Sequence, residues 1–149
     1  MRYALRFERA FKTDVWEPVE ASFAPDATYT IAGSDTEWDG VTRGARDIVA
    51  LFKRMLDALD RKYDRRSPRP DGWPRLDDGA LVVPWRARYV LGSDEVMLHG
   101  TSRCRFDTGN AGAGIGGIMG GRRITELSDT MTSPAECRRW GELAGITVR

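Results

Sequence analysis

The chain is poor in the residues that build metal sites and disulfide frameworks. Its 149 residues include one histidine, His99, and two cysteines, Cys104 and Cys137. These three side chains cannot supply the four ligands of a Cys/His zinc site, and two cysteines do not make the framework of a small secreted protein. We therefore expect no bound metal and no disulfide scaffold.

Long hydrophobic runs are also absent. The longest apolar run, residues 80–85, is far shorter than the roughly 18 residues that a membrane-spanning helix needs, and it contains Pro84. The first residues interleave charges with apolar side chains from Arg2 to Arg9, unlike the continuous apolar segment of a signal peptide. We expect a cytoplasmic protein that makes no contact with a membrane.

Neither sign of charge dominates the chain. Its 23 lysines and arginines nearly balance its 22 aspartates and glutamates. This balance gives no overall field that would draw the protein to nucleic acid, so nucleic acid is not an expected partner. The composition, 41% hydrophobic and 30% charged, is typical of a globular protein, and the length predicts a single domain over residues 1–149.

Hydrophobic periodicity and capping patterns predict four helices. In the two longer ones, apolar residues recur with the spacing of one helical face. The two shorter ones begin at capping patterns, Asp14 with Glu17 and Ser133 with Pro134. The expected helices cover residues 2–13, 14–24, 45–61 and 133–145.

Alternation of apolar and polar residues predicts strands in much of the remainder. Two long alternating runs are separated by a turn at Gly92 to Asp94, which is typical of an antiparallel pair. The expected strands cover residues 27–31, 81–91, 96–106 and 122–131.

Three segments rich in turn-forming residues predict loops: residues 33–44, residues 65–79 and the glycine-rich residues 109–121. In the last of these, Gly112, Gly114 and Gly117 match the GxGxxG pattern of dinucleotide-binding folds. That pattern needs a strand before it and a helix after it, and no such unit is expected here. We therefore interpret the match as accidental.

The order of elements, helices followed by a meander of long strands, indicates an α+β fold with helices on one face of a curved sheet. Five segments carry a similarity to known proteins: VWEPVEASFAPDATY, TRGARDIVALFKRML, VPWRARYVL, HGTSRCRF and RRITELSD. Together they resemble the NTF2-like superfamily, and within it the SnoaL-like proteins. The resemblance implies a cystatin-like half barrel, a curved antiparallel sheet with helices packed over its concave face, an apolar pocket, no cofactor and a homodimer.

The superfamily includes ketosteroid isomerases, polyketide cyclases, scytalone dehydratase, limonene epoxide hydrolase and members without a known reaction. The three functional positions of the isomerases fall on Phe7, Ile31 and Ser102, and none of these carries the required group. The arginine and aspartates of the epoxide hydrolase find no match in an ungapped comparison. The resemblance thus disfavours both reactions.

Asp129 is the main catalytic candidate. The alternation that directs Leu127 and Met131 inward directs Asp129 inward too. Burial raises the pKa of a carboxyl group, which suits a general acid or base acting on a carbon acid or a hydroxyl. SnoaL-like cyclases are similar in using an aspartate of a late strand. The structural alternative is that Asp129 accepts hydrogen bonds from the last helix, Tyr29 or Tyr89 and holds the sheet edge.

The remaining candidates share the expected inner face. Tyr29 and Tyr89 could donate to an oxyanion, while ordinary core packing is the alternative for every aromatic residue. Trp38 lies on a glycine-flanked loop, where it would close the mouth or pack in a dimer interface. No neighbour activates the thiol of Cys104, which should behave as an apolar group. The expected lining is Phe7, Ile31, Trp38, Trp85, Ser102, Cys104, Leu127 and Met131.

The opposite, polar face of the two long strands carries His99, which argues against a catalytic histidine. Four arginines share that face, where acidic residues of a partner subunit would neutralise them; an anion site is the alternative. They are Arg86, Arg88, Arg103 and Arg105.

Two functions follow from these features. The first is a cofactor-free isomerase, dehydratase or cyclase that acts on a small apolar oxygenated ligand through Asp129. The second is a non-catalytic ligand-binding or dimerisation module. A cavity of ~300 Å³ or more that exposes Asp129 and a tyrosine would favour the first. A half barrel whose interior is filled by its own aromatic side chains, with Asp129 hydrogen-bonded to the backbone, would favour the second.

Overall fold

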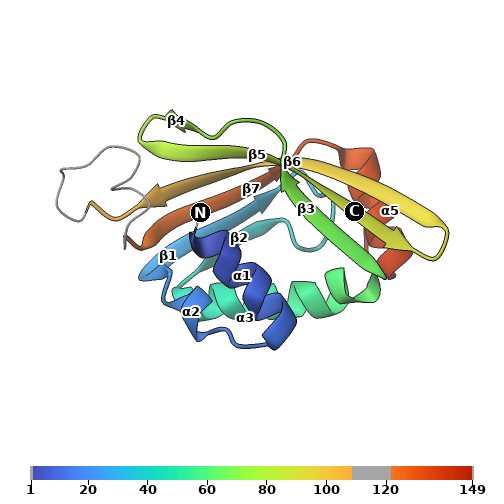
Figure 1. Ribbon diagram of the computed structural model, residues 1–149, viewed down its shortest axis with the longest axis horizontal. Helices are drawn as coiled ribbons and strands as arrows, with labels where there is room; N and C mark the ends of the chain where they lie inside the picture. Colours follow the sequence, from blue (N-terminus) through green and yellow to red (C-terminus); the bar gives the residue numbers. More distant parts are fainter. Residues whose placement is uncertain (1, 109–121, 149) are drawn as a thin grey trace.

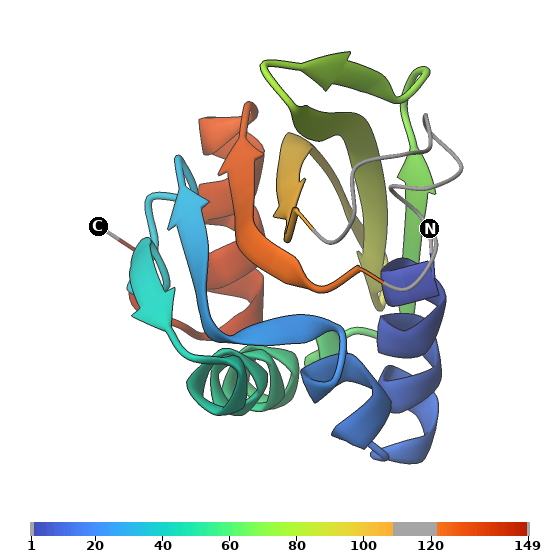
Figure 2. The same cartoon turned by 90° about the vertical axis from the view of Figure 1, so that its left-hand side faces the viewer.

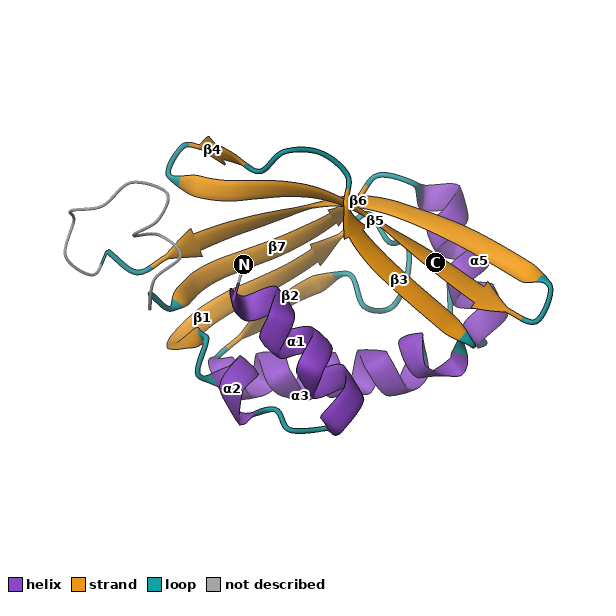
Figure 3. Ribbon diagram, viewed as in Figure 1, coloured by secondary structure: helices purple, strands orange, loops and turns teal. Residues whose placement is uncertain are grey.

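The computed structural model describes residues 2–108 and 122–148 and shows a curved sheet with helices on its concave side (Figures 1 and 3). The glycine motif at residues 112–117 lies outside the described residues. The helices are α1 (Arg2–Thr13), α2 (Glu17–Glu20), α3 (Ala45–Ala58), the 3₁₀ helix η1 (Asp60–Lys62) and α5 (Pro134–Ala144). The strands are β1 (Phe23–Ala32), β2 (Gly40–Arg43), β3 (Arg65–Pro70), β4 (Arg75–Asp77), β5 (Ala80–Leu91), β6 (Asp94–Phe106) and β7 (Ile124–Met131).

The sheet is unclosed, and its strands follow the order β2-β1-β7-β6-β5-β3, with β4 also paired to β5. Helix α3 carries the chain from β2 at one edge to β3 at the other, and the chain then returns through β5, β6 and β7. All strand pairs are antiparallel except β1 and β7, which are parallel. The sheet curls around a space that the helices cover (Figure 2). The predicted half barrel is confirmed, with this one parallel pair added.

The helices form where apolar periodicity and terminal residues favour them. In α3, Ile48, Phe52 and Leu56 recur every fourth residue and are all buried. Helix α5 begins with Pro134 and ends at Gly145, whose φ of 75° is left-handed. Both ends confirm the prediction. The hydroxyl of Ser133 accepts a hydrogen bond from the backbone N–H of His99 at 3.0 Å, so it ties the helix start to β6.

The prediction of a loop over residues 65–79 was wrong, because β3 and β4 lie within it. Strand β3 pairs with β5 from Arg65 opposite Val90 to Pro70 opposite Trp85. Two prolines in RRSPRP argue against a strand, yet an edge strand needs backbone donors on one side only, and β3 is an edge strand.

Three other boundaries differ from the prediction. Strand β2 lies within the expected loop of residues 33–44 and pairs with the exposed edge of β1. Helix α2 is only four residues long, because β1 begins at Phe23, earlier than alternation alone suggested. Helix α3 ends at Ala58 and gives way to η1.

The core consists of two clusters on the concave side of the sheet. The larger cluster packs α1, α2 and α3 against β1 and β7, and Phe52 contacts Phe7 and Tyr29 edge to face, with ring centroids 5.2 Å and 5.0 Å away. The smaller cluster packs α5 against β5 and β6, with Trp140 beside Tyr89. Among the described residues, none of the helices has the length and apolarity needed to cross a membrane.

The arginines of the outer face find acidic partners within the chain, which corrects the expectation that a partner subunit neutralises them. Three of the four acids belong to the segment between β3 and β5, which includes β4, and the fourth belongs to β6. The pairs are Arg86 with Asp71, Arg88 with Glu95, Arg103 with Asp77, and Arg105 with Asp78. His99 also lies on this face, 3.3 Å from Asp71.

Candidate functional site

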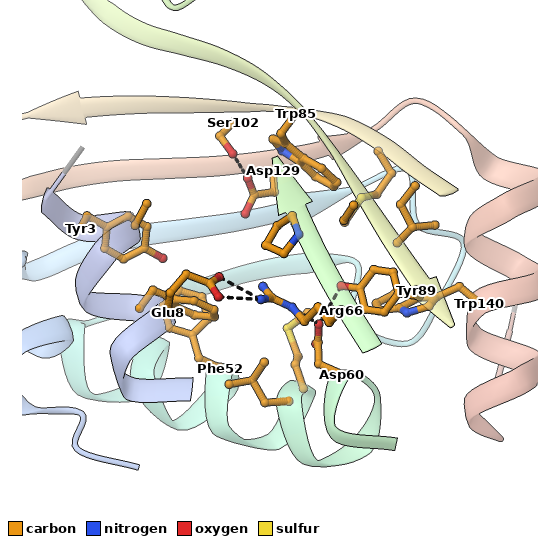
Figure 4. Close-up of a pocket in the computed structure, with 18 of the residues that line it drawn as sticks. Tyr3, Glu8, Phe52, Asp60, Arg66, Trp85, Tyr89, Ser102, Asp129 and Trp140 are labelled. Carbon is orange, nitrogen blue, oxygen red and sulfur yellow. Dashed lines mark hydrogen bonds and ion pairs between the residues drawn. The ribbon is translucent and has the colours of Figure 1, made fainter. Parts of the chain in front are cut away.

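A cavity of about 230 Å³ lies between the concave face of the sheet and the helices (Figure 4). It is lined by Tyr3, Ala4, Phe7 and Glu8 of α1, Tyr29 of β1, Phe52, Met55 and Leu56 of α3, Asp60 of η1, Arg66 and Pro68 of β3, Trp85, Ala87 and Tyr89 of β5, Leu98 and Ser102 of β6, Asp129 and Met131 of β7, and Trp140 of α5. The wall is thus mainly aromatic and aliphatic, with three carboxyl groups and one guanidinium. Its volume is below the ~300 Å³ that would favour an enzyme, although Asp129 and Tyr29 line it as that function requires.

Asp129 lies in the sheet-facing wall of this cavity, held by side chains of two neighbouring strands. Tyr29 Oη donates to Asp129 Oδ2 at 2.8 Å, and the hydroxyl of Ser102 donates to Asp129 Oδ1. Ser102 is the cross-strand partner of Asp129 in the pairing of β6 with β7. Each carboxylate oxygen therefore has a side-chain donor.

The environment of Asp129 makes its carboxyl group a weaker acid than that of an exposed aspartate. Burial raises the pKa of this carboxyl group above its usual 3.8, and the hydrogen bonds from Ser102, Tyr29 and Trp85 offset part of that rise. A carboxyl group with a raised pKa accepts and returns a proton more readily near neutrality than an exposed aspartate does.

A second polar cluster, Glu8 with Arg66 and Asp60, lies across the cavity from Asp129 (Figure 4). Arg66 Nη1 donates to both oxygens of Glu8, at 2.8 and 3.0 Å, and Arg66 Nε donates to Asp60 Oδ1 at 2.7 Å. Tyr89 Oη donates to the same Asp60 oxygen at 2.7 Å. Burial acts to lower the pKa of Arg66, but Tyr89, Asp60 and Glu8 together raise it, so the guanidinium stays charged.

The four tyrosines differ in whether their hydroxyls are already bonded. Tyr29 and Tyr89 donate to Asp129 and Asp60, and Tyr63 donates to the carbonyl of Trp140 at 2.5 Å. The hydroxyl of Tyr3 forms no hydrogen bond with any described residue, and it points toward the cavity in Figure 4. Burial, followed by the nearby Asp129, raises the pKa of both Tyr3 and Tyr29 well above 10.0, so both phenols keep their proton.

Seven of the residues expected from the sequence line the cavity. They are Phe7, Tyr29, Trp85, Tyr89, Ser102, Asp129 and Met131. Tyr29 and Tyr89 are not free donors, however, because each has a carboxylate partner.

Four expected residues lie elsewhere, which corrects the predicted lining. Ile31, Cys104 and Leu127 are buried in the larger core cluster, because alternation fixes the face of a strand but not the part of that face that the helices cover. Burial raises the pKa of the Cys104 thiol to about 12. Trp38 is partly buried against both clusters and does not close the mouth.

The sequence did not reveal the second cluster. Glu8 lies on the polar side of a helix, Asp60 follows α3, and Arg66 lies in a segment interpreted as a solvated loop. Tyr3 could have been predicted from the sequence as a lining residue, because it shares a helical face with Phe7 four residues later. Trp140 belongs to the terminal helix, which was expected only as a possible hydrogen-bond donor to Asp129 and not as part of the lining.

The described residues contain no group of three or more His, Cys, Asp or Glu side chains that could hold a metal ion.

The curved sheet, the covering helices and the cavity between them define a protein with an NTF2-like fold. Over 94% of this chain and 95% of the other, the fold matches an NTF2-like protein of unknown function from Burkholderia pseudomallei, with a TM-score of 0.64 and 20% identity. TerC, co-crystallised with polyporic acid, matches with a TM-score of 0.65 and 13% identity over 95% and 96% of the two chains. An LEH-like epoxide hydrolase from M. tuberculosis matches with a TM-score of 0.55 and 17% identity over 93% and 89%.

These identities establish a shared fold and no more. No protein-family model matches the chain, and no curated protein matches it in sequence.

Proposed function

We propose that this protein binds one small, apolar, oxygenated molecule in the cavity and catalyses its isomerisation, dehydration or cyclisation without a cofactor, with Asp129 transferring the proton. The observation that carries the proposal is a buried carboxyl group with a raised pKa in the wall of an otherwise largely apolar cavity. Ligand-bearing relatives of the same fold, such as TerC with polyporic acid, add general support.

The cavity volume limits the size of the ligand. An apolar cavity of about 150 Å³ holds one benzene molecule. A cavity of about 230 Å³ therefore suits a molecule with one ring and a short substituent, or a compact bicycle. A tetracyclic substrate would need the helices to move away from the sheet.

Proton transfer by Asp129 would proceed as follows. The ionised carboxylate takes a proton from the carbon next to a substrate carbonyl, and the electron pair of that C–H bond moves into the enolate. Tyr3, whose hydroxyl has no hydrogen-bond partner within residues 2–108 and 122–148, donates a hydrogen bond to the enolate oxygen. Asp129 then returns the proton to another carbon in an isomerisation, to the β-hydroxyl group that leaves as water in a dehydration, or to the alkoxide that forms when the enolate carbon attacks a second carbonyl in a cyclisation. Tyr29 and Ser102 keep the carboxylate oriented throughout.

Hydrogen–deuterium exchange of small cyclic ketones in heavy water tests the proposal without knowledge of the natural substrate. We expect the protein to accelerate deuterium incorporation next to the carbonyl, as followed by proton NMR. Asp129→Asn should lower that rate at least about 100-fold. The matched control is Asp26→Asn, because Asp26 is an exposed aspartate of β1 outside the cavity. An Asp129→Asn protein that exchanges at the wild-type rate would refute the assignment.

A second candidate function, ligand binding without turnover, is favoured by the same hydrogen bonds. Both oxygens of Asp129 already have donors, which is what a structural carboxylate requires. In that case fragments would bind in the cavity but no ketone would exchange. The homodimer implied by the family resemblance stays a prediction, which sedimentation velocity would test.

A further inference from the structure

The mechanism above leaves the cluster of Glu8, Arg66 and Asp60 without a role, although all three residues line the cavity. They come from α1, β3 and η1, so the cluster joins the helical cover to the edge of the sheet. The side chains of Arg66 and Asp60 are 13% and 9% exposed, and that of Glu8 is 39% exposed. A charge so little exposed to water needs partners, and Arg66 has two.

The pairing geometry leaves no net positive charge for a ligand. Both carboxylate oxygens of Glu8 accept hydrogen bonds from Nη1 of Arg66, and Asp60 accepts a hydrogen bond from Nε. One guanidinium thus faces two carboxylates, and the formal charge of the cluster is −1. Asp129, on the opposite wall, adds a further negative charge whenever it is ionised.

Without Glu8, Arg66 would be a good receptor for an anion. A guanidinium in a largely apolar cavity, with two N–H groups of Nη1 free, binds carboxylates through charge-assisted hydrogen bonds. Arg66 Cζ lies over the rings of Phe7 and Phe11, 5.9 and 5.1 Å from their centroids, and these cation–π contacts would hold the guanidinium in place. Glu8 occupies the position that a ligand carboxylate would take.

We infer that the ligand of this cavity is uncharged, and that Glu8 is the specificity residue that excludes anions from it. This inference rests on the proposed function, since it names the substrate class of the same cavity. Selectivity of this kind arises from unfavourable contact with the wrong ligand, here like charge placed beside like charge.

Binding of benzyl alcohol and benzoate, two one-ring compounds that differ in charge, tests the inference. Titrations at neutral pH can follow the fluorescence of Trp85 and Trp140, which line the cavity, with NMR of the ligand as a second readout. In the wild type, benzyl alcohol should bind at least about tenfold more tightly than benzoate. Glu8→Gln, which keeps an acceptor for Arg66, should bind benzoate at least about tenfold more tightly than the wild type does.

The matched control is Glu17→Gln, because it removes the same charge from an exposed side chain of α2 that lies outside the cavity. It should keep the wild-type preference. Circular dichroism and thermal melts establish that each variant is folded. Arg66→Gln in the Glu8→Gln background should abolish the new benzoate binding, because the guanidinium that binds the anion is then gone.

Three results would overturn the inference: wild-type protein that binds benzoate as tightly as benzyl alcohol, wild-type protein that takes up neither compound, or folded Glu8→Gln protein that gains no benzoate binding. The catalytic proposal is tested separately, by the rate of ketone exchange in the Asp129→Asn variant. A protein that selects against benzoate but exchanges no ketone would keep the charge selectivity and lose the catalytic proposal.

Discussion

Trp85 lies directly opposite Gly100 in the pairing of β5 with β6, and its indole fills the space that a side chain at residue 100 would need. A Cβ atom at residue 100 would lie 2.8 Å from Trp85 Cε2 and 2.8 Å from the carbonyl oxygen of Thr130. The glycine thus lets the ring lie against the sheet as part of the cavity wall. This placement also brings the indole near Asp129, where it offsets part of the rise in the pKa of that carboxyl group.

Gly100→Ala should destabilise the protein by roughly 1 to 3 kcal/mol, because the methyl group displaces the indole and presses on the backbone of β7. Urea denaturation measures the change in the free energy of unfolding. Trp85→Phe in the same background should recover part of the loss, since the smaller ring can move aside. The two changes should therefore be non-additive by at least about 0.5 kcal/mol, and strict additivity would contradict the proposed contact.

The effect of Asp129 on stability should depend on pH. Because burial raises its pKa in the folded protein, the folded state binds a proton more tightly than the unfolded chain does. The stability that Asp129 contributes is fully present below the ordinary value of 3.8 and is lost as the pH rises through the folded-state pKa. Wild-type stability relative to Asp129→Asn should therefore fall with rising pH over this window. Denaturation curves of the two proteins at matched pH values isolate this difference, and a difference that grows with pH would contradict it.

Tyr3→Phe and Tyr89→Phe remove the same atom from two sides of the cavity but should act differently. The Tyr3 hydroxyl has no partner among the described residues, so its loss should leave thermal stability nearly unchanged while slowing ketone exchange about 100-fold. Tyr89→Phe breaks a buried hydrogen bond to Asp60 and should cost roughly 1 to 3 kcal/mol of unfolding free energy. Melting curves and exchange rates for the pair check both expectations. Equal stability losses would show that Tyr3 is a structural residue.

Both cysteines should be inert in the folded protein. Burial raises the pKa of Cys104 to about 12 and that of Cys137 to about 11, so little reactive thiolate exists near neutral pH. Neither thiol should react with Ellman's reagent until urea unfolds the chain, and both should then react. Rapid labelling of Cys104 in folded protein would mean that the cavity or the sheet opens to the reagent.

How far the sequence predicts this structure varies with the type of element. Period-2 alternation correctly assigned the inner faces of β5 and β6, because side chains of a strand alternate between faces whatever lies above them. The same rule failed for RRSPRP, since its prolines are compatible with a strand only at a sheet edge. Whether a segment lies at an edge depends on the whole topology and cannot be read locally.

The candidate site divides in a similar way. Asp129 could be placed on the inner face from its own strand, and Ser102 from the strand next to it. The extent of the cavity could not be predicted, because Cys104 and Leu127 share that face yet lie beneath the helices in the core. Which part of a sheet the helices cover is decided by packing between distant segments.

The sequence by itself determined the α+β class, the faces of the long strands and the inward direction of Asp129, because these follow from periodicities within single elements. Only the tertiary structure decided which polar groups meet in the cavity. Glu8 and Arg66 are 58 residues apart in the chain, and Tyr29 and Asp129 are 100 apart. The sequence offered Tyr29 as one of three possible partners of Asp129 and did not decide among them, and it gave no signal for the pair of Glu8 with Arg66. Both pairs form because folding brings buried charges and hydroxyls within hydrogen-bond distance of partners that offset the cost of leaving water.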